Sequence, residues 1–90
     1  MSALPKGPIA IAPGFRFQWE EVQQAYVMLY PEGMIALNAS AGEILKRCDG
    51  IRTMEAIVED LQRQFPDADL TADVREFLEG AYERGWLQSR

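Results

Sequence analysis

The sequence predicts an α+β domain, in which a three-stranded antiparallel β-meander is followed by three helices in a winged helix-turn-helix-like arrangement. Apolar and polar residues alternate with a period of two in the first half of the chain, which is typical of half-buried strands. From residue 38 onward the apolar spacing becomes helical, and turn residues divide this region into three segments. Strands that precede helices along a chain favour a small sheet packed against a helical cluster.

The length and composition indicate one domain. Ninety residues leave no room for two independent cores, and 48% hydrophobic with 26% charged residues is ordinary for a globular protein. Residues 1–14 are rich in proline and glycine and show no periodicity. We therefore expect a flexible N-terminal arm over residues 1–14 and a folded domain over residues 15–88.

Three segments have the character of strands. Apolar and polar residues alternate from Phe15 to Glu20, and residues 25–30 are rich in aromatic and β-branched side chains. Pro31-Glu32-Gly33 supplies turn residues, after which residues 34–37 form a short third strand. We expect the strands to pair in chain order. The residues expected on one apolar face are Trp19, Val27, Leu29, Ile35 and Leu37.

The first predicted helix follows the strands directly. Asn38 or Ser40 can cap its start, and Ser40 stands three residues before Glu43, as in a capping box. Asp49-Gly50 ends the helix, since glycine accepts the left-handed conformation. Its apolar stripe consists of Ala41, Ile44, Leu45 and Cys48.

Two more helices complete the domain. Thr53 is the expected cap of the second helix, which Pro66 ends, and Thr71 is the expected cap of the third, which ends near Gly85. We expect the segment after Gly85 to fold back onto the core. The apolar stripes are Met54, Ile57, Val58, Leu61 and Phe65 in the second helix, and Val74, Phe77, Leu78, Ala81 and Tyr82 in the third.

The composition argues against an enzyme. The chain has no histidine, and its single cysteine, Cys48, lies on an apolar stripe where a buried structural role is expected. We therefore expect no catalytic residue, no metal site and no cofactor. No stretch approaches the roughly 20 apolar residues that span a bilayer. A lone cysteine is also typical of a protein of the reducing cytoplasm, where we expect this one.

A winged helix-turn-helix shape suggests a DNA-binding regulator as the alternative function. The formal net charge of −5 argues against it, because DNA binding depends on basic groups that displace phosphate counterions. The third predicted helix would also enter a groove with an acidic surface. It carries Asp73, Glu76, Glu79 and Glu83 against Arg75 and Arg84.

The third predicted strand lies at an edge of the sheet. Residues 34–37 carry no charge and no proline, the usual devices that block edge pairing. An extended peptide could add there as a fourth strand, or the N-terminal arm, a helix or a second copy could cover the edge. The third helix could form the opposite wall of a groove. Its candidate residues are Val74, Phe77, Leu78 and Tyr82.

An ordered set of short motifs over residues 12–88 closely resembles the PqqD family. These motifs are Tyr30-Pro31-Glu32-Gly33, Leu37-Asn38, Glu43-Ile44-Leu45, Cys48-Asp49-Gly50, Thr53 to Ile57, Asp73-Val74, Phe77-Leu78 and Arg84-Gly85-Trp86-Leu87. Each motif alone is weak, but their order is specific.

The resemblance implies a function. PqqD-like domains are peptide chaperones of the RiPP recognition element class, which serve ribosomally synthesised and post-translationally modified peptides. They bind the leader of the precursor peptide PqqA in pyrroloquinoline quinone biosynthesis and present it to the radical-SAM enzyme PqqE. In related domains the leader adds beside the third strand, in a groove that the third helix completes. The residues this implies here are Met34, Ile35, Ala36 and Leu37, with Val74, Phe77, Leu78 and Tyr82 opposite. We expect a monomer in solution, with a strand-swapped or domain-swapped dimer as the alternative.

Overall fold

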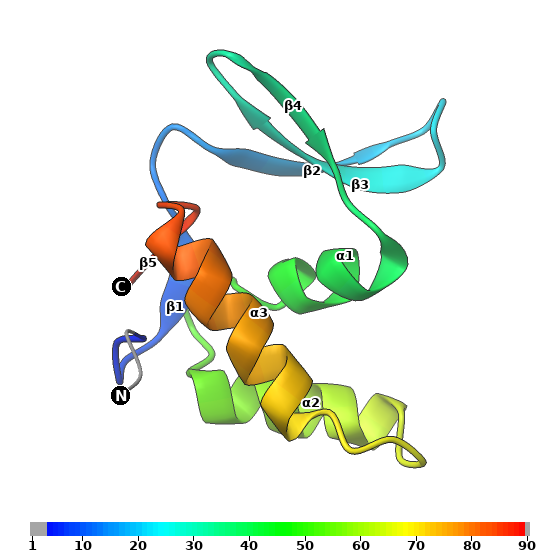
Figure 1. Ribbon diagram of the computed structural model, residues 1–90, viewed down its shortest axis with the longest axis vertical. Helices are drawn as coiled ribbons and strands as arrows, with labels where there is room; N and C mark the ends of the chain where they lie inside the picture. The colour runs from blue at the N-terminus through cyan, green and yellow to red at the C-terminus, as the bar shows by residue number, and fades with distance from the viewer. Residues whose placement is uncertain (1–3, 90) are drawn as a thin grey trace.

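A computed structural model describes residues 4–89 of the chain, which form two small sheets and three helices (Figure 1). The larger sheet is antiparallel and contains β2 (Arg16–Glu20), β3 (Ala25–Tyr30) and β4 (Gly33–Ala36), in the order β2-β3-β4. The helices α1, α2 and α3 follow it and lie on one side of it. The predicted α+β fold, with a three-stranded meander before three helices, is confirmed.

The register of the sheet corrects the predicted apolar face. Trp19 pairs with Tyr26, and Met28 pairs with both Phe17 and Ile35. Directly opposed residues share a face, so Ile35 lies on the face of Trp19 as expected. Val27 and Leu29 lie on the other face. The turn at residues 21–24 sets this register, and a shift of one residue would reverse every side chain.

The ends of the first two helices follow the predicted caps. In α1 (Ala39–Lys46), the Asn38 side chain accepts a hydrogen bond from the backbone N–H of Ala41 at 2.8 Å. In α2 (Met54–Gln64), Thr53 Oγ1 accepts one from the backbone N–H of Ala56 at 3.2 Å. Each cap satisfies a backbone donor that the helix leaves unpaired. Asn38, and not Ser40, is therefore the cap of α1.

The predicted cap of the third helix is wrong. Thr71 is the first residue of α3 (Thr71–Glu83), and Leu70 occupies the cap position without a side-chain bond. Neighbouring residues supply the missing acceptors. Gln62 Oε1 accepts from the Leu70 N–H at 3.2 Å, and Asp69 Oδ1 accepts from the Thr71 N–H at 3.3 Å. A side chain of α2 therefore satisfies a backbone donor at the start of α3, and no local cap motif in the sequence predicts this bond.

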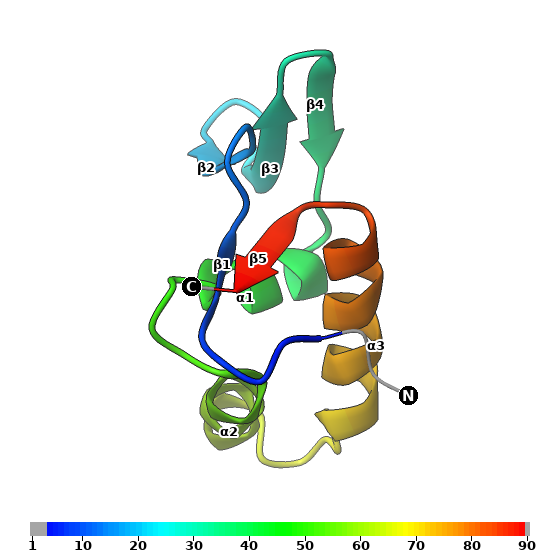
Figure 2. The ribbon, with the colours of Figure 1, turned by 90° about the vertical axis from the view of Figure 1, so that its left-hand side faces the viewer.

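The expected N-terminal arm contains a strand. β1 (Ile9–Ile11) pairs antiparallel with β5 (Leu87–Ser89), and Ile9 is 0% exposed (Figure 2). Ile9 also bonds the loop after α1, because its N–H donates to the Arg52 carbonyl at 3.0 Å. The expectation of a flexible arm is therefore wrong for these residues, although Leu87 returns to the core as expected. Residues 1–3 of the expected arm lie outside the described residues.

The core lies between the helices and one face of the larger sheet. It joins β1, β3 and β5 to the apolar stripes of all three helices. Its buried members are Ile9, Met28, Leu37, Ala41, Ile44, Leu45, Cys48, Ile57, Leu61, Val74, Leu78, Ala81 and Leu87.

Candidate functional site

β2 and β4 are the two edges of the larger sheet, and the candidate edge is β4. It is the last strand in the order β2-β3-β4, and it stands on the side of the molecule where α3 lies (Figure 2). Neither a charged residue nor a proline interrupts Gly33–Ala36. Within the described part of the N-terminal segment, Ile9–Ile11 pairs with β5 and not with this edge.

The hydrogen-bond pattern identifies which main-chain groups point outward from β4. The Leu37 N–H donates to the Tyr26 carbonyl at 3.1 Å, so Leu37 points its main-chain groups toward β3. In an antiparallel pair, inward and outward residues alternate. Ile35 therefore also faces β3, whereas the N–H and C=O groups of Met34 and Ala36 point away from the sheet. These four groups form the template on which another strand can pair.

The side chains along β4 differ in accessibility. Met34 is 45% exposed and Ala36 is exposed, whereas Ile35 is half-buried and Leu37 is buried. Met34 and Ala36 lie on the outer face of the sheet, and Ile35 lies on the face of Met28, which packs into the core. Of the predicted strand residues, Ile35 is thus the one whose side chain is accessible on the helical side.

The predicted residues of α3 do not all line one surface. Val74 and Leu78 are core residues, at 2% and 0% exposure, and Phe77 and Tyr82 are half-buried. At about 100° per residue, Phe77 and Tyr82 lie about 140° apart around the helix axis, on opposite flanks of the buried stripe. The flank of Phe77 also carries Asp73, which lies close to the start of α1. Phe77 is therefore the α3 candidate on the α1 side.

The sequence did not reveal an apolar pocket where three helix ends meet. It has a volume of about 370 Å³ and lies among the first turn of α1, the end of α2 and the start of α3. We call it the helix-end pocket. Its lining residues are Ala39, Ser40, Glu43, Ile44, Leu61, Phe65, Ala68, Leu70, Asp73 and Val74. The one sequence feature that could have pointed to this pocket is Phe65, which continues the apolar stripe of α2 beyond the end of the helix. In the structure its side chain is 46% exposed.

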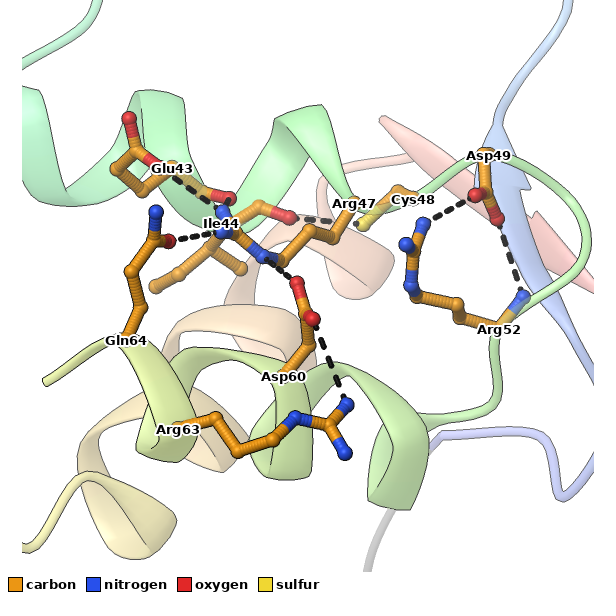
Figure 3. A network of polar contacts seen from close by, with 9 residues as sticks. All are labelled: Glu43, Ile44, Arg47, Cys48, Asp49, Arg52, Asp60, Arg63 and Gln64. Carbon is orange, nitrogen blue, oxygen red and sulfur yellow. Dashed lines mark hydrogen bonds and ion pairs between the residues drawn. The ribbon is translucent and has the colours of Figure 1, made fainter. Parts of the chain in front are cut away.

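The main buried polar group is structural. The Arg47 side chain, at the end of α1, donates from Nε to Asp60 Oδ2 at 2.5 Å and from Nη1 to Glu43 Oε1 at 2.9 Å, and it also bonds Gln64 (Figure 3). The hydrogen bond from Arg47 lowers the pKa of Asp60. Arg47 thus ties α1 to α2, and every polar atom that it buries has a partner.

Nothing in the described chain suggests covalent or metal chemistry. Cys48 is 4% exposed, its thiol donates to the Ile44 carbonyl at 3.5 Å, and burial raises its pKa to about 12. Its expected burial is confirmed. Across residues 4–89, no three histidine, cysteine, aspartate or glutamate side chains gather to hold a metal ion. None of the helices within this range is long and apolar enough to cross a membrane.

Most of the chain matches a known protein family. Residues 25–87, which run from β3 through all three helices, match the family model described as coenzyme PQQ synthesis protein D (PqqD). The chain belongs to the PqqD family. The resemblance expected from the motifs is therefore confirmed.

Curated relatives of this PqqD-family chain are named PqqA binding proteins. The protein from Methylococcus capsulatus is 47% identical over 88 residues, which cover 98% of this chain and 95% of the relative. Those from Stutzerimonas stutzeri and Azotobacter vinelandii are each 54% identical, over 86% and 83% of this chain and 85% and 83% of the relatives.

A solved structure has the same fold. The solution NMR structure of the PqqD truncation of Methylobacterium extorquens PqqCD superimposes with a TM-score of 0.73 at 28% identity. The match covers 97% of this chain and 96% of the other. That PqqD truncation is described as a functional and stand-alone RiPP recognition element.

Proposed function

We propose that this PqqD-family chain binds the leader of the precursor peptide PqqA along β4 and presents it to the radical-SAM enzyme PqqE in pyrroloquinoline quinone biosynthesis. The outward N–H and C=O groups of Met34 and Ala36 carry this proposal, because they offer an unblocked template for an added strand. The relatives named PqqA binding protein and the solved recognition element support the choice of peptide. The chain contributes binding and orientation, and the chemistry belongs to the partner enzyme.

The energetics require apolar anchors in the peptide. Four main-chain hydrogen bonds contribute about 1 kcal/mol each, against an association cost of about 4–15 kcal/mol. Two or three buried apolar side chains add about 1.5–3 kcal/mol each. Successive peptide residues alternate between faces, so every second side chain would point with Ile35 toward the helices. The Phe77 flank of α3 is the proposed opposite wall.

The α3 surface gives no support to the DNA-binding alternative. The flank that carries Phe77 presents the carboxylates of Asp73 and Glu76 and one guanidinium, that of Arg84. Arg84 already lies over the Trp86 ring, with 5.7 Å between its Cζ and the ring centroid. A phosphate backbone would be repelled here.

A monomer is the binding species in this proposal. A second copy paired along β4 would occupy the groups that the leader needs, so dimerisation and leader binding would compete. Size-exclusion chromatography with and without PqqA would test this, with a 1:1 complex expected.

We also propose a cytoplasmic location, because ribosomal precursor peptides are made there.

The decisive experiment is a titration of labelled protein with PqqA followed by NMR. We expect saturable shifts at residues 33–37 and around Phe77 in the wild type. Ala36→Pro removes an outward N–H and keeps the bonds to β3, so it should weaken binding by about 1–3 kcal/mol, because a peptide carbonyl is left unpaired, without unfolding the domain. Ala36→Ser keeps the N–H and is the matched control. Equal affinity of both variants would disprove strand addition, and a wild type without shifts would disprove PqqA binding.

A further inference from the structure

The helix-end pocket lies where the β4 edge ends. Ala39 and Ser40, which form part of its rim, stand only three and four residues after Ala36. The chain runs from β4 down into the first turn of α1, above the connection between α2 and α3 (Figure 1). An extended chain advances about 3.3 Å per residue, so a peptide that passes Ala36 reaches the pocket within about four residues.

We propose that the helix-end pocket receives one bulky apolar side chain of the same leader, three or four residues beyond the residue that pairs with Ala36. This inference rests on the proposed strand addition and adds a subsite to it. The β4 groove alone offers few apolar contacts, because Leu78 is buried and Tyr82 lies on the other flank of α3. The pocket supplies the anchor that main-chain pairing lacks.

The lining fits an apolar side chain. Ile44, Leu61, Leu70 and Val74 form its walls, and Phe65 remains 46% exposed until something covers it. A volume of about 370 Å³ is at the lower end of the range for ligand pockets, so it can accept a leucine or phenylalanine side chain. Of the polar lining residues, Ser40 and Asp73 are exposed and Glu43 is bonded to Arg47, so none of them imposes a buried hydrogen bond on the occupant.

The rim adds a charge preference. Glu43 forms an ion pair with Arg47 at 2.9 Å, but the Asp73 carboxylate has no ion-pair partner within residues 4–89. Asp73 therefore favours a lysine or arginine next to the apolar anchor in the leader. The proposed occupant is therefore an apolar residue that stands next to a lysine or an arginine in the leader.

The test blocks the pocket without touching β4. Ala39→Trp places a large side chain at its rim, on an exposed position in the first turn of α1. Ala72→Trp is the matched control, because Ala72 is exposed in the first turn of α3 and does not line the pocket. We expect Ala39→Trp to weaken PqqA binding at least tenfold in calorimetry, while Ala72→Trp binds like the wild type.

Truncated leader peptides make the spacing testable. Removing the anchor residue should weaken binding to the wild type and leave binding to Ala39→Trp unchanged, because that variant has already lost the contact. Asp73→Asn should reduce the salt dependence of binding. Undiminished PqqA affinity of Ala39→Trp would overturn the subsite, even if that variant bound PqqE less well. If Ala39→Trp kept its affinity but Ala36→Pro lost affinity in the same series, only the subsite would be disproved, and the proposed function would still stand.

Discussion

Gly42 of α1 lies directly against the ring of Tyr26 of β3. A Cβ added at Gly42 would lie 2.8 Å from Cδ2 of that ring, closer than such atoms approach in real structures. The ring cannot easily move away, since it stacks on Phe17 with 4.7 Å between centroids and meets Trp19 edge-on at 5.0 Å. The contact sets the distance between α1 and the sheet.

This contact predicts that Gly42→Ala destabilises the domain. Alanine usually stabilises a helix interior by up to about 1 kcal/mol relative to glycine, but overpacking against an immobile ring costs about 1–3 kcal/mol. We expect a net loss in urea denaturation. Gly80→Ala is the control, because its Cβ would meet only the flexible end of Arg84 at 3.1 Å. That variant should gain stability, and a similar gain in Gly42→Ala would refute the tight contact.

Ile9 should be essential to stability although it lies near the N-terminus. It is 0% exposed and belongs to the core, so Ile9→Ala should lower the free energy of unfolding by about 2–5 kcal/mol. Ile51→Ala is the control, since Ile51 is 79% exposed and its truncation should change stability by less than about 0.5 kcal/mol. Equal stability of the two variants in denaturant titrations would mean that β1 is not docked.

The Arg47–Asp60 pair predicts a specific pH dependence. The hydrogen bond from Arg47 lowers the pKa of Asp60 in the folded state, below the value of about 3.9 in an unfolded chain. The stability contributed by this pair is therefore fully present above that unfolded value and is lost as the pH falls through the folded pKa.

Arg47→Met should accordingly be less stable than the wild type at pH 7. The difference between the two proteins should shrink as the pH falls below about 4, because protonated Asp60 no longer benefits from Arg47. Denaturant titrations at a series of pH values would measure it. A difference that stays constant down to pH 2 would show that Arg47 acts by packing alone.

Cys48 should be unreactive in the folded protein. Its pKa of about 12 leaves almost no thiolate at pH 8, and only 4% of the residue is exposed. Alkylation by iodoacetamide, followed by mass spectrometry, should be at least about a hundredfold slower in buffer than in guanidinium chloride. Fast labelling in buffer would mean that α1 opens readily.

The helices and the main sheet could be predicted because their signals are local. Asn38 and Thr53 are side-chain caps within three residues of the donors they satisfy, and Pro66 and Gly85 mark the ends of periodic segments. The edge at β4 was predictable for the same reason, since strand order followed from short turns. These features depend on neighbours in the chain, which the sequence displays.

The rest depends on contacts between distant segments. β1 and β5 are three residues each, and neither has enough length for a pattern of period two. The start of α3 is bonded by Gln62, eight residues before Leu70, and the helix-end pocket exists only where α1, α2 and α3 meet. Apolar periodicity predicted the same apolar stripe for Val74 and Phe77, but only the packing of distant segments determines that Val74 is buried and Phe77 is half-buried.

The pairing of Ile9 with Ser89 brings the first and the last strand of the domain side by side, and both strands lie away from β4 (Figure 1). An enzyme tethered through either end would thus leave the free edge of the sheet open. A short tether would also hold the bound leader at a high effective concentration for its enzyme, without any contact between the two folded bodies. Covalent linkage to the enzyme and free association with it would then be alternative ways of delivering the same peptide.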